Sequence, residues 1–207
     1  MNDPIAPLRH FVVQATQLAG REMGEAQRRA ALRPLLAQLI ADDTWLPDWA
    51  AQPHPEHYQQ YLLHCDPLER FSVVSFVWGP GQRTPVHDHT VWGLIGMLRG
   101  AETGQRYARN ALGTVVPQGA PQRLERGEIE AVSPSIGDIH VVANALADRA
   151  SISIHVYGAN IGAVARHVYE PGTDRVKDFV SGYACAQVPN LWDRSRAVRA
   201  SLGGARP

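Results

Sequence analysis

Cysteine is scarce in this sequence: Cys65 and Cys185 are the only two among 207 residues. They stand far apart and form no CxxC pair, so the dense, even spacing of a secreted disulfide framework is absent. This usage is typical of proteins from a reducing compartment. We therefore expect a cytoplasmic protein.

Long hydrophobic runs and an excess of one charge are missing too. No run of about eighteen apolar residues occurs, and the start, MNDPIAPLRHF, lacks a basic flank followed by an apolar stretch. Twenty basic residues balance twenty acidic ones, so no net field attracts nucleic acid or an anionic membrane. No glycine-rich phosphate loop and no helix-turn-helix pattern is evident. We expect neither nucleic acid nor a membrane as partner, and we leave open whether the chain is a monomer or a homo-oligomer.

The first fifty residues carry two apolar patterns with helical spacing. The apolar positions recur three and four residues apart, as on one face of a helix. They are Leu8, Phe11, Val12, Ala15 and Leu18, then Leu32, Leu35, Leu36, Leu39 and Ile40. Pro34 falls inside the second pattern, and proline bends a helix or begins a new one. We expect a helical segment over residues 1–50, with a kink or a restart at Pro34.

From about residue 57 the sequence changes to short runs rich in β-branched and aromatic residues. The runs are YQQYLLH, RFSVVSFVW, VWGLIGML, GQRYARN, HVVANA, SISIHVY and RHVYE. Between them, GTVVPQGAPQ (residues 113–122) is typical of a turn-rich connection. Many short strands predict a mainly β sandwich or barrel. The length suits a single domain, with residues 1–50 packed on a barrel formed by residues 51–207.

Two histidines, His87 and His89, flank Asp88 in the segment PVHDH. In a strand, residues two apart project to the same face, so both imidazoles can point at one spot while Asp88 faces away. Neutral imidazole binds iron, zinc, copper and nickel. The pair is a candidate half-site for such a metal, and an HxH pair on a strand surface is the alternative.

The segment GQRTPVHDHTVWGLIGMLRG resembles the first signature of the cupin superfamily. Its spacing is kept by Gly81, His87, His89 and Gly100. Gly93 stands where many cupins carry a glutamate ligand, so the site would contain no carboxylate. The second cupin signature is matched in PSIGDIHVVAN by Gly137, His140 and Asn144. The resemblance implies a cupin double-stranded β-helix (jelly-roll) barrel with N-terminal α-helices, and makes His140 the third metal ligand.

A second constellation is Ser153, His155 and Tyr157, which alternate in SISIHVYG. In a strand these three side chains share a face, while Ile152, Ile154 and Val156 occupy the other. A polar row on an otherwise apolar strand costs stability unless its groups hydrogen-bond to each other or to a ligand. We expect Ser153 to orient His155, and His155 to orient the Tyr157 phenol toward the metal pocket; an outward-facing polar strand is the alternative.

Three histidines without a glutamate, followed by a Ser-His-Tyr row, make residues 55–185 similar to the thiol dioxygenases. This is the family of cysteine dioxygenase and 3-mercaptopropionate dioxygenase. The resemblance implies Fe(2+) held by His87, His89 and His140, with a small thiol and O2 as the substrates. Both oxygen atoms end on sulfur, which gives a sulfinic acid. Catalytic roles would then fall to Tyr157, His155 and Ser153.

Two departures resemble the bacterial branch that prefers 3-mercaptopropionate over cysteine. Gly93 stands where mammalian-type enzymes carry a cysteine cross-linked to the active-site tyrosine, so no cross-link forms. Gln60 stands where cysteine dioxygenases use an arginine to bind the substrate carboxylate, and a neutral amide cannot make that bidentate ion pair. The resemblance suggests Arg166 for this role, and Trp92 is a further candidate for the pocket lining.

Two other functions are compatible with a cupin. One is an isomerase, or a dioxygenase acting on carbon, that uses zinc, manganese or nickel. The other is a ligand-binding cupin without turnover. The Ser-His-Tyr row disfavours the second, because a passive pocket has little need for an oriented phenol.

Overall fold

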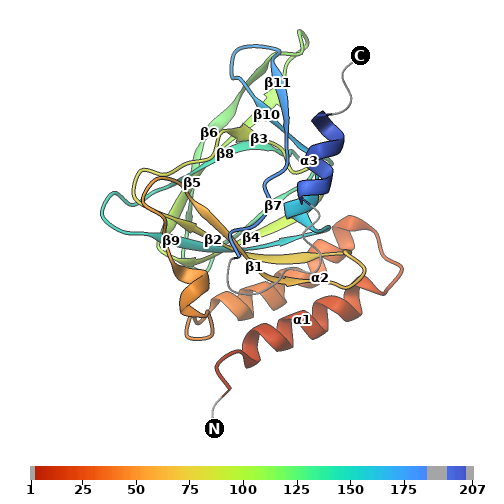
Figure 1. The fold of residues 1–207 in the computed structure, drawn as a ribbon, viewed down its shortest axis with the longest axis vertical. Coiled ribbons are helices and arrows are strands. Elements are labelled where there is room, and N and C mark those ends of the chain that lie inside the picture. The colour runs from red at the N-terminus through yellow and green to blue at the C-terminus, as the bar shows by residue number, and fades with distance from the viewer. Residues whose placement is uncertain (1–2, 186–194, 204–207) are drawn as a thin grey trace.

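The structure is a computed structural model that describes residues 3–185 and 195–203. Two antiparallel sheets enclose a barrel, and helices cover one of them (Figure 1). The helical elements are α1 (Ala6–Ala19), α2 (Glu25–Ile40), η1 (Asp48–Ala51), η2 (Ile161–Ala163) and α3 (Ser195–Gly203). The strands are β1 (Gln59–Cys65), β2 (Ser72–Trp78), β3 (Val86–His87), β4 (Gly93–Arg99), β5 (Ala101–Arg109), β6 (Val115–Glu125), β7 (Ile129–Val132), β8 (Ile139–Asn144), β9 (Ser151–Tyr157), β10 (Arg166–Tyr169) and β11 (Val176–Phe179). One sheet has the order β1-β2-β9-β4-β7 and the other β11-β10-β3-β8-β5-β6.

The two N-terminal helices form where the apolar patterns predict them. The first pattern supplies the buried face of α1, which comprises Leu8, Phe11, Ala15 and Leu18. Helix α2 runs through Pro34 without a restart, so that part of the expectation is wrong. Buried residues on both sides of Pro34 belong to the core cluster shared with the sheet, and this common packing holds α2 as one helix.

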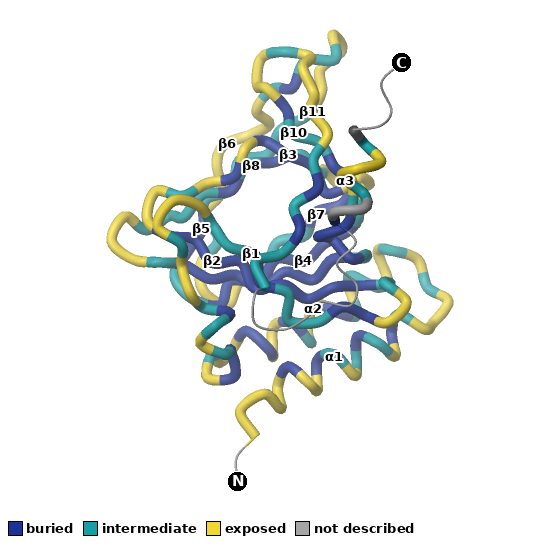
Figure 2. Tube along the Cα trace, viewed as in Figure 1, coloured by how far each residue is buried: buried dark blue, intermediate teal, exposed yellow. Residues whose placement is uncertain are grey.

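Helix α2 lies close on strand β4 because Gly96 has no side chain. A Cβ atom at Gly96 would stand 3.0 Å from Ile40 Cδ1 and 3.1 Å from Leu36 Cγ. The sheet beneath is therefore buried on both faces, and Figure 2 shows its inner strands in dark blue. These strands need apolar or hydrogen-bonded residues at consecutive positions. SVVSFVW is mostly apolar, and the polar residues Ser153, His155 and Tyr157 of SISIHVY hydrogen-bond to one another.

Alternate residues of β2, β4 and β9 serve two different cores. The face toward the helices includes Val73, Val77, Leu94, Leu98, Ile152, Ile154 and Val156. The face toward the barrel interior includes Val74, Phe76, Trp78 and Tyr157. This alternation turns the odd-numbered polar residues of β9 into the barrel.

Residues 113–122 form most of strand β6, so the expected turn-rich connection is wrong. Strand β6 lies at the edge of its sheet and pairs with β5. An edge strand tolerates Pro117 and Pro121 because a missing N–H can face away from the ladder. Gly119 adopts φ +70° near a register shift between Gly104 and Arg106 of β5, which absorbs the irregular segment.

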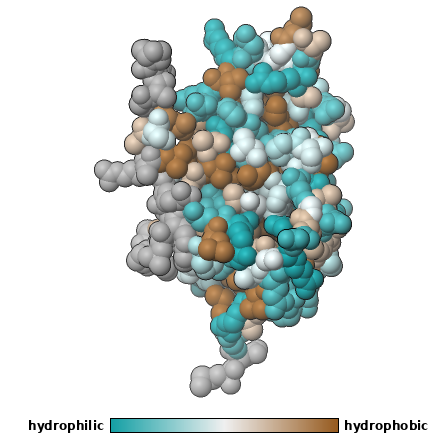
Figure 3. Space-filling view, turned by 90° about the vertical axis from the view of Figure 1, so that its right-hand side faces the viewer, coloured by the Kyte–Doolittle hydropathy of each residue, from teal (hydrophilic) through white to brown (hydrophobic). Residues whose placement is uncertain are grey.

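The surface is mixed in character. On the face that Figure 3 shows, hydrophobic side chains form small groups between hydrophilic ones. Scattered groups of this kind are ordinary on protein surfaces. Within residues 3–185 and 195–203, no helix combines the length and hydropathy needed to cross a bilayer.

Candidate metal centre

Three histidines converge inside the barrel, as the sequence predicts. One ring nitrogen from each of His87, His89 and His140 lies within 4.8 Å of the others, and all three residues are buried. His87 of β3 pairs directly with His140 of β8. The strand argument for the HxH pair is wrong in one respect: β3 ends at His87, and His89 lies just beyond it.

His89 is aimed by a carboxylate rather than by strand geometry. Its Nδ1 lies 3.0 Å from Asp138 Oδ1, and its backbone N–H donates to Asp138 Oδ2 at 3.1 Å. The backbone N–H of Thr90, which has φ +58°, donates to the same oxygen at 2.8 Å. His87 Nδ1 lies 3.0 Å from the Pro85 carbonyl. In both histidines Nδ1 is thus engaged and Nε2 remains for a metal.

The electrostatics of the cluster suit a metal ion. Burial lowers the pKa of His87 and of His140 well below the usual range, and the neighbouring imidazoles lower it further. Both rings are therefore neutral, which is the form that ligates metals. The described residues of the cluster include no carboxylate, so the donor set is three imidazole nitrogens, which suits iron, zinc, copper or nickel.

Asp88 faces away from the histidines, as expected. Its carboxylate accepts the His167 backbone N–H at 2.8 Å and the Tyr169 hydroxyl at 2.6 Å, and lies 2.7 Å from His167 Nδ1. These contacts attach Asp88, which lies between the two histidines, to strand β10. They therefore help to fix the positions of His87 and His89.

Ser153, His155 and Tyr157 form the predicted row. Ser153 Oγ lies 2.8 Å from His155 Nε2, and His155 Nδ1 lies 2.8 Å from the Tyr157 hydroxyl. Phe76 stacks on His155 with ring centroids 4.0 Å apart. The Tyr157 ring stacks on His89 at 5.4 Å, which places the phenol end of the row beside the candidate metal ligands.

Gly93 gives Tyr157 its place. A Cβ atom at Gly93 would stand 2.8 Å from Tyr157 Cδ1 and 2.9 Å from Cε1, closer than real contacts allow. Any larger residue at this position would displace the tyrosine ring or the strand. The glycine therefore does more than omit a ligand or a cross-link partner, because the ring lies directly against its backbone.

Arg166 is a buried cation near the cluster. It stands two residues from Val168, the register partner of His87, and its charge lowers the pKa of His87. The guanidinium lies over the Phe179 ring at 4.5 Å from the centroid and donates to Ser181 Oγ at 2.7 Å. Its Nε is buried without a hydrogen-bond partner, and no ion pair of Arg166 occurs among the described side chains.

The other two candidate substrate residues lie in different surroundings. Gln60 is buried and pairs in register with Phe76, so it shares the interior face, where its amide donates to the Gly182 carbonyl. Trp92 instead belongs to the core cluster on the helix side, and its indole fills the space beside Gly158. The structure thus places Trp92 in the core. Neighbouring residues of an extended chain point to opposite faces, and Gly93 faces Tyr157 on the interior side.

A model of the family "Cysteine dioxygenase type I" matches residues 48–166, which is more than half of the chain. The chain belongs to the cysteine dioxygenase type I family. Family membership implies a dioxygenase, and it agrees with a cupin double-stranded β-helix that carries N-terminal helices. The matched segment contains all three histidines and the Ser-His-Tyr row.

Solved structures are also similar to this family member. An uncharacterized conserved protein with a double-stranded β-helix domain from Klebsiella pneumoniae is 19% identical, with 59% of this chain and 93% of that chain covered and a TM-score of 0.43. A Cupin 2 conserved barrel domain protein from Salinispora arenicola is 18% identical, with 55% and 86% covered and a TM-score of 0.41.

Proposed function

We propose that this protein is a non-haem iron thiol dioxygenase that converts a small thiol carboxylate and O2 into a sulfinic acid. The favoured substrate is 3-mercaptopropionate, with cysteine next. The observation that carries the proposal is a buried set of three imidazoles beside the phenol end of a Ser-His-Tyr row, in a member of the cysteine dioxygenase type I family. A cytoplasmic setting, where thiols stay reduced, suits such a substrate.

His87, His89 and His140 would hold the metal. Ferrous iron, when bound there, supplies a centre that favours the thiolate form of the substrate and reacts with dioxygen. Three protein ligands leave coordination positions for exogenous molecules. The chain's contribution is to keep the His87 and His140 imidazoles neutral by burial, and to aim His89 through Asp138 and His87 through the Pro85 carbonyl.

Tyr157 would orient the bound reactants through its hydroxyl. Burial raises the pKa of Tyr157, so the phenol stays protonated at neutral pH. Burial also lowers the pKa of His155 well below its usual range, which keeps that imidazole neutral and able to bridge Ser153 and Tyr157. The row therefore holds one phenol proton in a defined place at the pocket.

Arg166 would bind the substrate carboxylate. A buried cation without an acidic partner is costly, and a carboxylate that reaches it recovers a charge-assisted, bidentate interaction. Gln60, at the place where cysteine dioxygenases carry arginine, is neutral and already donates to Gly182. A thiol and a carboxylate on one short molecule would then span the distance from the histidines to Arg166.

The proposal is tested by oxygen uptake with iron-loaded protein. We expect 3-mercaptopropionate to consume O2 and yield its sulfinic acid, with slower uptake for cysteine and cysteamine. Protein loaded with zinc serves as the matched control and should be inactive. Absence of uptake with all three thiols would overturn the proposal, and activity that follows zinc, manganese or nickel would indicate a different cupin enzyme.

A further inference from the structure

The segment Val180–Gly182 follows strand β11 and joins Arg166 to the C-terminal helix α3, which lies beside it in Figure 1. The Ser181 hydroxyl accepts a hydrogen bond from Arg166 Nη2 at 2.7 Å. Arg199 of α3 donates from Nε to the Val180 carbonyl at 3.0 Å, and from Nη2 to the Ser181 carbonyl at 2.9 Å. Two arginines thus bind the same segment, one through a side chain and the other through the backbone.

The backbone of this segment is held at every carbonyl. Arg199 binds two consecutive carbonyls through one planar guanidinium, whose donors have fixed directions. Gly182 permits this approach: it has φ +71°, and a Cβ atom there would stand 2.8 Å from Arg199 Nη2. The Gly182 carbonyl accepts the Gln60 amide, and the Gly182 N–H donates to the Gly162 carbonyl at 2.9 Å. The segment is therefore fixed by groups from distant parts of the chain.

The Arg166 guanidinium depends on this segment and on the end of β11 for its orientation. Among the described residues, its hydrogen bond to Ser181 is the only one that the side chain makes. The Phe179 ring, 4.5 Å from the guanidinium carbon, supplies a second contact from two residues earlier. Arg166 is 4% exposed, so water does little to hold it. The position of Ser181 consequently determines where the guanidinium points.

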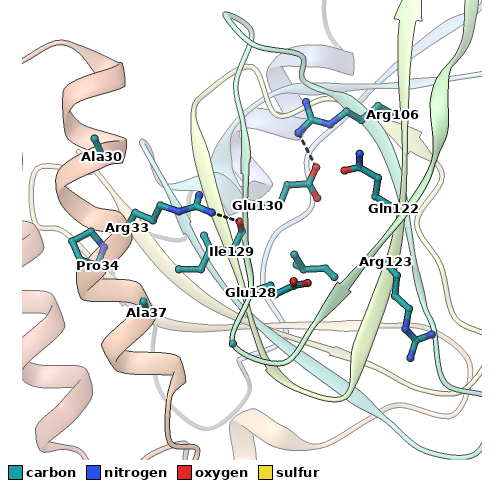
Figure 4. Close-up of a pocket in the computed structure, with 12 residues that line it drawn as sticks. Ala30, Arg33, Pro34, Ala37, Arg106, Gln122, Arg123, Glu128, Ile129 and Glu130 are labelled. Atoms are coloured by element: carbon teal, nitrogen blue, oxygen red, sulfur yellow. Dashed lines mark hydrogen bonds and ion pairs between the residues drawn. The ribbon is translucent and has the colours of Figure 1, made fainter.

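Another arginine joins a helix to the barrel in a comparable way. Arg33 of α2 donates to the Ile129 carbonyl of β7 at 2.7 Å, across the cleft that α2 forms with β5, β6 and β7 (Figure 4). In the same cleft Arg106 is paired with Glu130 at 2.8 Å. Strand β7 belongs to the sheet that does not contain β10, the strand of Arg166. Arg33 is thus a matched comparison for a helix-to-carbonyl contact remote from that guanidinium.

We propose that Arg199 is a positioning residue that, through Ser181, sets the orientation of Arg166 for the carboxylate of a small thiol substrate. The inference rests on the proposed thiol dioxygenase function. It gives helix α3 a part in selecting thiols that carry a carboxylate. A displacement of about 1 Å in a group that positions substrate can cost about 100-fold in rate, so the firmness of the Ser181 anchor matters at the site.

Steady-state oxygen uptake by the iron-loaded protein, with 3-mercaptopropionate and with cysteamine, tests the inference. In Arg199→Gln we expect the KM for 3-mercaptopropionate to rise by about 10-fold, because its carboxylate meets a misplaced guanidinium. The kcat should stay close to wild type, because the carboxylate contact is the same before and during the reaction. Both constants for cysteamine, which has no carboxylate, should also stay close to wild type. A defect of the fold alone would lower kcat for both thiols.

Two further variants separate positioning from charge and from misfolding. Arg199→Lys keeps the positive charge but has no planar fork for two carbonyls, so its KM for 3-mercaptopropionate should rise as in Arg199→Gln. Ser181→Ala removes the hydrogen bond to Arg166 and leaves both carbonyls to Arg199, and it should show the same rise. Arg33→Gln is the matched control and should equal wild type with both thiols.

The outcomes distinguish this inference from the proposed function. A KM for 3-mercaptopropionate that rises in Ser181→Ala but not in Arg199→Gln, or in neither, would overturn the role of Arg199 and leave the proposed function standing. A wild-type KM in Arg199→Lys, or an equal loss of kcat/KM for both thiols in Arg199→Gln, would do the same. Wild type that consumes no O2 with either thiol would instead overturn the proposed function.

Discussion

Asp138 holds His89 through both of its carboxylate oxygens. Oδ1 lies 3.0 Å from Nδ1 of the imidazole, and Oδ2 accepts the His89 backbone N–H at 3.1 Å. The side chain of Asp138 is mostly buried, so solvent does not compete strongly for these bonds. A carboxylate in this position fixes the ring orientation of a metal-binding histidine and makes its other nitrogen a stronger ligand for the metal.

Replacing Asp138 should weaken the metal site without removing a ligand. We expect Asp138→Asn to lower metal affinity by about 10- to 100-fold, because the amide lacks the negative charge that makes the His89 imidazole a stronger ligand. Competition with a chelator measures the affinity. Asp148→Asn, at an exposed position, is the control and should bind metal like wild type. Equal affinity of Asp138→Asn and Asp148→Asn would show that Asp138 does not support the site.

The two classes of histidine should separate in metal content and turnover. His140→Ala should lose most of its iron on gel filtration, because two ligands remain. His155→Ala should keep its iron but lose turnover by roughly 100-fold, because the Tyr157 hydroxyl is no longer held. Metal analysis beside initial rates checks both. Equal iron loss in the two variants would mean that His155 supports the metal rather than the reactants.

Substitution of Arg166 should discriminate between thiols with and without a carboxylate. We expect Arg166→Gln to reduce kcat/KM for 3-mercaptopropionate by roughly 100-fold, in the range for loss of one partner of a buried charge pair. The kcat/KM of Arg166→Gln for cysteamine, which has no carboxylate, should fall much less. Arg175→Gln, an exposed arginine, is the control. A uniform decrease for both thiols would argue that Arg166 acts through the fold instead.

Glu102 should make the stability of wild type fall as pH rises toward neutrality. Burial raises the pKa of Glu102 to about 7 in the fold, from about 4.5 for an unburied glutamate, so the folded state binds the proton more tightly. The stability of wild type is therefore lost as pH rises from about 4.5 through 7. The glutamine of Glu102→Gln does not titrate. The free energy of unfolding of this variant, relative to wild type, should therefore rise by on the order of 3 kcal/mol over this pH range.

Urea unfolding at several pH values measures that difference. The comparison between the two proteins cancels the opposite trend from His87, His140 and His155, whose lowered pKa values destabilise the fold as pH falls. Parallel curves for wild type and Glu102→Gln would contradict the raised pKa.

Local spacing was enough to predict the parts of the site that lie on one strand or in one motif. The period of two in SISIHVY places Ser153, His155 and Tyr157 on one face, and their hydrogen bonds confirm it. The resemblance to the two cupin signatures predicted the cluster of His87, His89 and His140. The row depends on one short stretch of chain, whose geometry follows from residue order.

Contacts between segments that are distant in the chain could not be predicted from the sequence. Asp138 supports His89 from the β7–β8 connection, and Glu102, on a strand of the other sheet, is buried near Ser153. Neither carries a spacing signal, although Asp138 lies inside the second signature, where a polar residue next to Gly137 was a usable hint. Strand β6 was missed because its prolines are tolerated only at a sheet edge, which the order of strands determines.

In the proposed function, three imidazoles hold one ferrous ion, and a thiol binds that ion while its carboxylate binds Arg166. The decisive measurement is a crystal structure obtained without oxygen in the presence of iron and 3-mercaptopropionate. We predict iron among His87, His89 and His140, sulfur bound to the iron, and the carboxylate on the Arg166 guanidinium. Iron outside this cluster, or a thiol bound without contact to the metal, would contradict the account.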